Sequence, residues 1–171
     1  MNSKIIAFAI EAHQSTNHLY DGRPYSVHLA LVVSYAQKYI NIIPNESHDD
    51  VISACWLHDT IEDTRNTYND IKSISNKTVA DIVYALTNEK GKNRSERAND
   101  KYYSGIVTTP FAKFVKLCDR LANAKYSVDT NSRMKEVYQK ENSHFIESLF
   151  SAYEIEVQYR DMIRELIELL K

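Results

Sequence analysis

Residues 54–64 form the most distinctive segment of the sequence and read Ala54-Cys55-Trp56-Leu57-His58-Asp59-Thr60-Ile61-Glu62-Asp63-Thr64. An apolar run ends there in an adjacent histidine and aspartate, and a second acidic pair follows within one helical turn. The residues before His58 leave almost no polar face, so we expect a buried helix over about residues 47–59. Buried charged groups persist when they are paired or bind a metal ion. Imidazole nitrogen and carboxylate oxygen both suit a divalent cation, so the stretch suggests a metal site.

A simpler explanation exists for an isolated His-Asp pair. A histidine stabilises the C-terminus of a helix, and an aspartate favours the turn that follows. The same pair recurs at His48-Asp49, at the polar start of the expected helix, where we interpret it as solvated capping residues. A metal site therefore needs support from elsewhere in the chain.

Composition indicates one helical domain. The chain of 171 residues is long enough for a full core, and its 43% hydrophobic and 26% charged residues are ordinary for a globular protein. Three glycines and three prolines favour long helices over a β-sandwich rich in turns. We expect an all-α, single-domain helical bundle over residues 1–171. Its motif-bearing core covers about 5–130, and packing helices cover about 131–171.

Charge and cysteine content limit the partners and the compartment. The 21 basic and 23 acidic residues give a net charge of −2, with no sign of broad attraction to nucleic acid or membranes. The two cysteines lie in apolar surroundings and suggest buried, reduced thiols. No signal peptide is evident, and no apolar run approaches the roughly 18 residues of a membrane span. We therefore expect a cytoplasmic protein.

Periodicity predicts several helices, and two of them carry a polar residue that is out of place. A helix over Ser26–Tyr39, capped by Ser26, has His28 on a mostly apolar segment. A helix opened by Pro110 has Asp119 inside its apolar run. Aspartate is a poor helix former and is costly to bury, so Asp119 needs a strong partner. Further helices are expected over about 4–18 and 78–86 and through Tyr102-Tyr103 to Gly105, and one or two long packing helices are expected from about residue 133 to the end.

Three buried helices thus each contribute one anomalous polar feature. Two imidazoles and two carboxylates form a plausible set for Mn²⁺, Fe²⁺, Zn²⁺ or Mg²⁺, with positions left open for water or substrate. Independent coincidences would be needed to explain all of them as ordinary core residues. The sequence therefore predicts a metal site, with His28, His58, Asp59 and Asp119 as its candidate ligands.

A dense charged stretch follows the helix over 78–86. It has two interpretations, a solvated loop or an edge that binds the phosphates of an anionic ligand. The basic residues of this stretch are Lys90, Lys92, Arg94 and Arg97.

Three motifs in this order resemble the HD-domain metal-dependent phosphohydrolases, in particular the hydrolase domain of RelA/SpoT proteins and the small alarmone hydrolases. Gly22-Arg23-Pro24-Tyr25-Ser26-Val27-His28 matches G-x-P-Y-x-x-H. Leu57-His58-Asp59-Thr60-Ile61-Glu62-Asp63-Thr64 matches L-H-D-T-x-E-D-T. Lys116-Leu117-Cys118-Asp119-Arg120-Leu121-Ala122-Asn123 matches K-L-x-D-R-L-x-N. His-Asp alone is a weak signal, but the two longer motifs at this separation are highly specific.

The resemblance implies an all-α HD fold and a single metal ion, usually Mn²⁺, on the four ligands predicted above. It implies that Glu62 and Asp63 position or deprotonate the attacking water. It further implies removal of pyrophosphate from the 3′ position of guanosine tetra- or pentaphosphate, with Asn123 contacting the sugar. The basic loop would then meet the phosphate charge.

The sequence departs from the family just before the first motif. The family usually has an Arg-Lys pair there, near the guanine and its phosphates, whereas this chain has His18-Leu19-Tyr20-Asp21. We expect Tyr20 to stack on a base and Arg23 to supply charge from a shifted position.

Two other functions are compatible with the motifs. One is a different HD phosphohydrolase, such as a deoxynucleoside monophosphatase or an NADPH phosphatase. The other is an HD fold that senses a nucleotide without turnover, although a sensor has no need of the Glu62-Asp63 pair. Each of these functions has a small-molecule nucleotide as the ligand, and none requires nucleic acid or a membrane.

Overall fold

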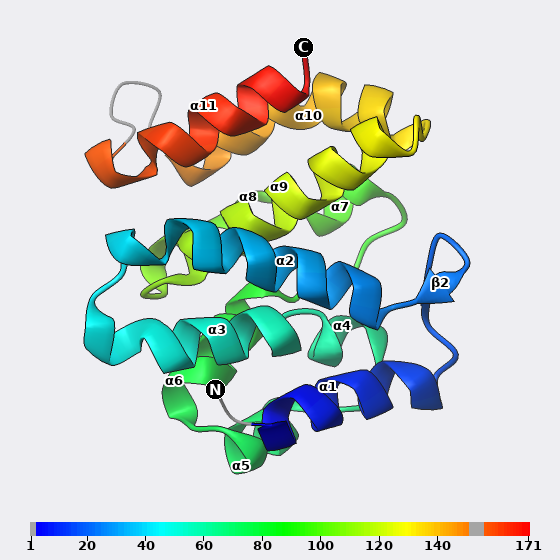
Figure 1. Ribbon diagram of the computed structural model, residues 1–171, viewed down its shortest axis with the longest axis vertical. Coiled ribbons are helices and arrows are strands. Elements are labelled where there is room, and N and C mark those ends of the chain that lie inside the picture. Colours follow the sequence, from blue (N-terminus) through cyan, green and yellow to red (C-terminus); the bar gives the residue numbers. More distant parts are fainter. Residues whose placement is uncertain (1–2, 151–155) are drawn as a thin grey trace.

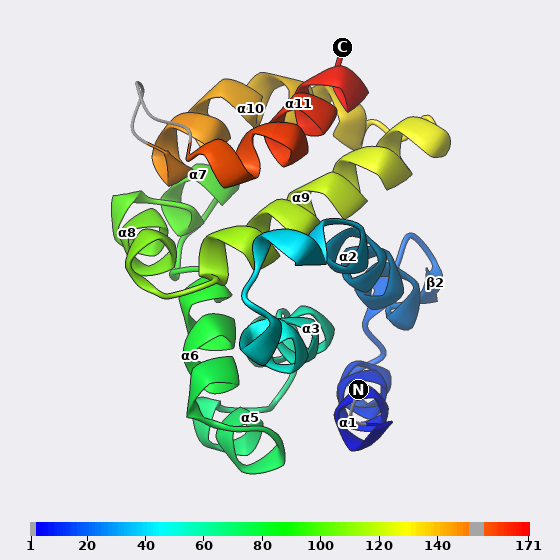
Figure 2. The same cartoon turned by 60° about the vertical axis from the view of Figure 1, so that its left-hand side comes forward.

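Helix α9 (Ala112–Asp129) runs through the middle of the protein (Figures 1 and 2). The computed structural model describes residues 3–150 and 156–171. Its apolar residues Phe114, Leu117 and Leu121 are fully buried. In Figure 1, α10 and α11 lie above α9, whereas α2, α3 and α1 follow below it in that order. Because α9 contacts helices on several sides, a polar residue on it is buried among elements far apart in sequence.

The expected all-α fold is confirmed. Within the described residues the only strands are two of two residues each. The remaining elements, in chain order, are α1 (Ser3–Ser15), β1 (Leu19–Tyr20), β2 (Arg23–Pro24), α2 (Ser26–Tyr39), η1 (Ile40–Ile42), η2 (Asn45–Ser47), α3 (His48–Leu57), α4 (Thr60–Asp63), α5 (Tyr68–Ile74), α6 (Lys77–Leu86), α7 (Arg94–Arg97), α8 (Asp100–Thr108), α10 (Met134–Leu149), η3 (Val157–Tyr159) and α11 (Arg160–Leu169).

The chain bends between α3 and α4, at the His-Asp pair. Asp59 has φ −98° and ψ 0°, outside the helical range, and the backbone N–H of Asp63 donates to its carbonyl at 2.9 Å. Neighbouring side chains on a regular helix point about 100° apart. The bend brings the side chains of His58 and Asp59 into contact instead, with 2.9 Å between Nε2 and Oδ2.

A two-residue turn joins β1 and β2. Asp21 and Gly22 both have positive φ, 51° and 75°, as the tight turns of β-hairpins require. The hairpin pairs Tyr20 with Arg23 in antiparallel register. The hairpin therefore fixes the position of Tyr20 close to the start of α2.

Several predicted helix boundaries are corrected. Ser26 is the first residue of α2 rather than its cap, since Tyr25 holds the N-cap position. Pro110 precedes α9 by two residues, because Phe111 takes a left-handed conformation with φ 65°. α8 continues past Gly105 to Thr108.

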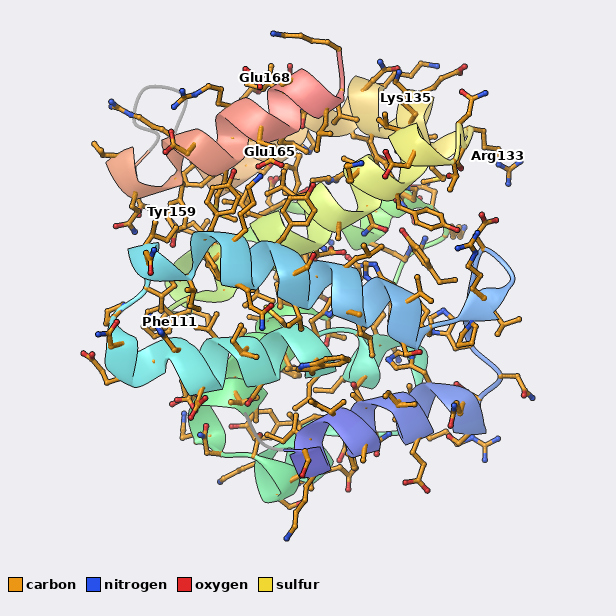
Figure 3. The ribbon with its side chains drawn as sticks, viewed as in Figure 1. Phe111, Arg133, Lys135, Tyr159, Glu165 and Glu168 are labelled. Carbon is orange, nitrogen blue, oxygen red and sulfur yellow. The ribbon has the colours of Figure 1, made fainter. Side chains whose placement is uncertain are left out.

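The C-terminal helices α10 and α11 pack on α9. The apolar face of α11 buries Met162, Ile163 and Leu166. Glu165 of α11, which Figure 3 labels, accepts a hydrogen bond from Lys38 of α2 at 2.6 Å, so the last helix also contacts the second. The sequence predicts one or two long helices after Ser132. Helix α10 ends at Leu149 and the next described element begins at Val157, and residues 151–155 lie outside the described part.

Two further expectations concern the chain as a whole. Among the residues that the structure describes, no helix has the length and apolar character needed to cross a membrane. The division into a motif-bearing core and C-terminal packing helices at about residue 130 stays a prediction.

Candidate active site

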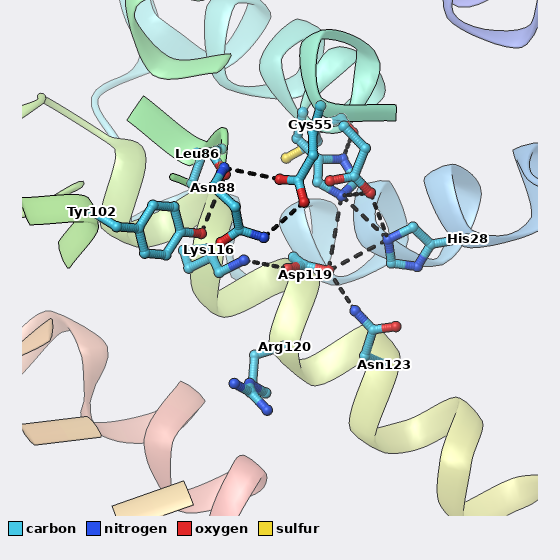
Figure 4. A network of polar contacts seen from close by, with 12 residues as sticks. His28, Cys55, Leu86, Asn88, Tyr102, Lys116, Asp119, Arg120 and Asn123 are labelled. Atoms are coloured by element: carbon cyan, nitrogen blue, oxygen red, sulfur yellow. Dashed lines mark hydrogen bonds and ion pairs between the residues drawn. The ribbon is translucent and has the colours of Figure 1, made fainter. Parts of the chain in front are cut away.

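Three polar side chains from three helices meet beside α9, at the place where the apolar runs of the sequence are broken. His28 comes from α2, His58 follows α3, and Asp119 lies within α9; all three are buried. The two Nε2 atoms are 3.2 Å apart, and Asp119 Oδ1 lies 3.4 Å from that of His28 and 3.8 Å from that of His58 (Figure 4). One ligand atom from each residue thus lies within 4.8 Å of the other two.

Asp59 completes the group. Its Oδ2 lies 2.9 Å from Nε2 of His58 and 3.5 Å from Nε2 of His28, and it accepts a hydrogen bond from the Tyr25 hydroxyl. The other ring nitrogen of His58, Nδ1, contacts the carbonyl oxygen of Cys55 at 2.9 Å. This backbone contact fixes the ring so that Nε2 faces the carboxylates, as partners of ligating histidines do in metal sites.

The charges of this group favour a cation. Burial would raise the pKa of Asp119, but the ammonium group of Lys116 and the two histidines hold it well below its usual range. Burial also opposes ionisation of Asp59, whose pKa is nevertheless lowered by His58 and His28. For His28, burial lowers the pKa, and its contacts with Asp119 and Asp59 outweigh this effect and raise it to about 9.

The donor set suits a divalent metal ion. His28, His58 and Asp119 could hold such an ion, and Asp59 adds an oxygen at the same point. Nitrogen and oxygen donors of this kind are shared by Mn²⁺, Fe²⁺, Zn²⁺ and Mg²⁺ sites, so the residues do not select one of these ions. The four residues that the sequence suggests as ligands lie together here, and their role as ligands stays a prediction.

The acidic pair after the bend has two different environments. Glu62 accepts hydrogen bonds from the backbone N–H and the side-chain amide of Asn88, at 3.0 and 2.7 Å. Oδ2 of Asp63 lies 3.8 Å from Nδ1 of His18. Burial raises the pKa of Asp63 to about 7, with further contributions from Asp59 and Glu62. Both carboxylates face the cleft described next.

A cleft of about 270 Å³ opens beside the histidine and aspartate side chains. Its walls come from α4, α7, α8, α9 and α10 as well as the start of α2. The lining residues are Tyr25, His28, Asp59, Glu62, Asp63, Asn88, Arg94, Ser95, Arg97, Ala98, Tyr102, Tyr103, Lys116, Asp119, Arg120, Asn123, Tyr138, Glu141 and His144.

The predicted substrate-binding residues divide into two groups. Arg94, Arg97 and Asn123 line the cleft. The other four, which are Tyr20, Arg23, Lys90 and Lys92, are not among its lining residues. Whether any of these seven binds substrate stays a prediction.

Tyr20 is placed against the histidine and aspartate group instead of in the cleft. Its ring stacks on that of His28 with 4.8 Å between centroids, and its hydroxyl donates to Asn123 Oδ1 at 3.0 Å. The amide of Asn123 in turn donates to Asp119 at 2.5 Å. Tyr20 thereby contacts the same group of side chains through both His28 and Asn123.

Sequence reasoning assigned no role to several side chains that the structure brings to the site. Lys116 lies three residues before Asp119 and donates to it at 2.9 Å, on the side away from Asn123 (Figure 4). The helical spacing within the third motif could have indicated this pair. Asn88 and Glu141 contact their partners across large sequence separations, which no local pattern reveals.

Comparison with known proteins identifies relatives of the chain. No protein-family model matches it. It is 32% identical over 124 residues to the guanosine-3′,5′-bis(diphosphate) 3′-pyrophosphohydrolase MESH1 of Danio rerio, covering 70% of this chain and 65% of that protein. It is 36% identical over 123 residues to the guanosine-3′,5′-bis(diphosphate) 3′-pyrophosphohydrolase of Aquifex aeolicus, of which it covers 16%. The chain is a relative of these hydrolases. The resemblance indicated by the three motifs is thus confirmed, although the chain spans less than two thirds of either relative.

A solved structure shares the fold. A metazoan orthologue of SpoT, described as hydrolysing ppGpp, superimposes with a TM-score of 0.72 over 99% of this chain and 94% of its own length. The two sequences are 19% identical, so this likeness concerns the fold. It extends over α10 and α11, which the sequence motifs do not reach. The expected all-α helical fold is therefore confirmed along nearly the whole chain.

Proposed function

We propose that the protein is a metal-dependent phosphohydrolase that removes pyrophosphate from the 3′ position of guanosine tetra- or pentaphosphate. The observation that carries this proposal is the convergence of His28, His58, Asp59 and Asp119 at one end of a cleft that also holds Glu62 and several arginines. The relatives named above carry this activity in their names.

The proposed ion site consists of the two histidines and two aspartates, and Mn²⁺ is the ion we expect there. When bound, the ion would supply positive charge that polarises the phosphoryl group and lowers the pKa of a water molecule. Fe²⁺, Zn²⁺ and Mg²⁺ are the alternatives that the same donors allow.

The chain's own residues carry the proton transfers. The oxygen of water forms a bond to the phosphorus next to the ribose, and its proton passes to the carboxylate of Glu62. Asn88 orients that carboxylate through its two hydrogen bonds. The bond between phosphorus and the 3′ oxygen breaks, pyrophosphate is released, and the 3′ oxygen takes up the proton that Glu62 accepted. Lys116 lines the cleft beside Asp119 and stabilises the negative charge of the phosphates.

The far end of the cleft is suited to the rest of the nucleotide. Arg94 and Arg97 offer guanidinium groups that bind phosphate oxygens in pairs. Asn123, at the edge of the ion site, contacts the sugar in this proposal. We place the reaction in the cytoplasm and expect neither nucleic acid nor a membrane as a partner.

The first prediction is a substrate profile. Purified protein with Mn²⁺ is incubated with guanosine 3′,5′-bis(diphosphate), deoxynucleoside monophosphates and NADPH, and released pyrophosphate and phosphate are measured separately. We expect pyrophosphate from the guanosine compound as the main product. Phosphate released from NADPH or from a monophosphate, with no pyrophosphate from the guanosine compound, would assign the cleft to another HD phosphohydrolase. No product from any of them, together with binding, would indicate a nucleotide sensor.

A further inference from the structure

A carboxylate lies between two arginines at the far end of the cleft. Glu141 of α10 accepts hydrogen bonds from Nε and a terminal nitrogen of Arg94, at 2.9 and 3.0 Å. Arg120 of α9 donates to the same carboxylate at 3.3 Å. All three residues line the cleft that also contains the proposed ion site. Figure 2 shows α7, which carries Arg94, below α10 and beside α9.

Arg120 is held in place independently of Glu141. Its guanidinium lies 4.3 Å from the ring centroid of Phe145 and 4.9 Å from that of Tyr138. Only 9% of its side chain is exposed. In Figure 4 it points away from Asp119 and the ion site. Packing against the two rings means that removing Glu141 leaves a positive charge still facing the cleft.

Glu141 and Arg94 are more accessible, with 31% and 51% of their side chains exposed. The two-point contact between them is the geometry by which arginine also binds phosphate. Glu141 therefore occupies the position that two phosphate oxygens would take. It also compensates the charge of Arg120, which would otherwise be a buried cation without a partner.

The chemistry of the proposed substrate matches this arrangement. A guanosine 3′,5′-bis(diphosphate) carries one diphosphate at each side of its ribose. If the 3′-diphosphate lies at the ion site, the 5′-diphosphate extends along the cleft toward the arginines.

We propose that Arg94 and Arg120 bind the 5′-phosphates of the nucleotide, and that Glu141 is an internal anion that the 5′-phosphates displace. This inference rests on the proposed function and adds a specificity-determining residue to it. Each phosphate must compete with Glu141 for the arginines. The binding free energy that the arginines contribute is therefore reduced by the cost of breaking their ion pairs with Glu141. Glu141 thereby sets how strongly the 5′-phosphates contribute to binding.

The test compares two probes that the proposed reaction cannot hydrolyse. Binding of guanosine 5′-diphosphate and of guanosine to the Mn²⁺-loaded protein is measured by calorimetry. Neither probe carries a 3′-phosphate, so the result does not depend on turnover. We expect Glu141→Gln to tighten binding of guanosine 5′-diphosphate about fivefold, the change that corresponds to one half-exposed ion pair. Binding of guanosine stays unchanged.

The matched control is Glu147→Gln, which removes the same charge from an exposed position of α10 that is not part of the cleft lining. Equal tightening in both variants would show that the effect comes from the change in net charge, and it would overturn the proposal. Weaker binding in Glu141→Gln would mean that the carboxylate positions Arg94 for the ligand, and unchanged binding would place the 5′-phosphates elsewhere. Either outcome contradicts displacement. If guanosine 5′-diphosphate binds more tightly to Glu141→Gln but the wild-type protein releases no pyrophosphate from the bis(diphosphate), the inference stands and the proposed function fails.

Discussion

The carboxylate of Asp119 lies between Lys116, Asn123 and the two histidines, so each of its oxygens has a different partner. The substitution Asp119→Asn keeps the shape and removes the negative charge. We expect it to reduce bound Mn²⁺ from one ion per chain to nearly none, because the oxygen donor loses its charge and Lys116 remains as an unpaired cation. Metal analysis of the purified variant measures this, with circular dichroism to confirm the fold. Asp129→Asn, at the end of the same helix, is the control and should keep its metal. Full metal content in Asp119→Asn would remove Asp119 from the ligand set.

At the residue scale, the sequence was informative where a side chain did not suit its surroundings. His28 and Asp119 stand out because each interrupts an apolar helical segment. Lys116 and Glu141 do not stand out, since a lysine or glutamate on a helix is ordinary until its partner is known. Their roles depend on tertiary contacts, such as that between Glu141 and Arg94 across 47 positions.

At the scale of elements, the periodicity of apolar residues predicted which segments are helical and in what order they come. It did not predict the residues at which the helices begin and end. The bend at Asp59 and the left-handed Phe111 both depend on neighbours distant in sequence. The basic stretch shows the same limit. Lys90, Lys92, Arg94 and Arg97 look equivalent in sequence, but only the two arginines, which belong to α7, line the cleft.

The tie between α11 and α2 supports a prediction about pH. Burial would raise the pKa of Glu165, but Lys38 and Tyr39 outweigh it and lower the pKa below its usual value. A lowered pKa in the folded state means that the carboxylate stabilises the protein at neutral pH, and that this contribution is lost as pH falls through the folded pKa. We expect Glu165→Gln to reduce the free energy of unfolding by about 0.5–1 kcal/mol at pH 7, since the pair is partly exposed and screened.

Urea unfolding of wild type and Glu165→Gln at neutral and acidic pH measures this contribution. The difference between them should shrink once the pH falls below the usual carboxyl pKa. Glu168→Gln, on the exposed side of the same helix, is the control and should behave like wild type at both pH values (Figure 3). A difference that is the same at acidic and neutral pH would show that the carboxylate charge does not stabilise the helix contact.

At the scale of the whole molecule, the helices on both sides of α9 contribute to one cleft. Helices α2 and α3 carry His28 and Cys55, whose carbonyl orients His58, and α10 supplies Glu141 at the far end. The sequence motifs include His28, Cys55 and His58 or lie next to them, but they do not extend to α10. The grouping of the four proposed ligands could therefore be predicted from the sequence, whereas the contribution of α10 required the structure.

The central claim is that the cleft performs hydrolysis with Glu62 as the base, next to an ion held by His28, His58, Asp59 and Asp119. Glu62→Gln keeps the shape and can still accept a hydrogen bond from Asn88, but it cannot take up a proton. We predict a fold and a Mn²⁺ content like those of wild type, with kcat for guanosine 3′,5′-bis(diphosphate) reduced by about 10²–10⁴-fold, the usual contribution of a general base. The decisive measurement is kcat and bound Mn²⁺ on the same preparation. Near-normal kcat with normal Mn²⁺ would contradict the claim, and loss of Mn²⁺ together with kcat would make Glu62 a ligand of the ion instead of the base.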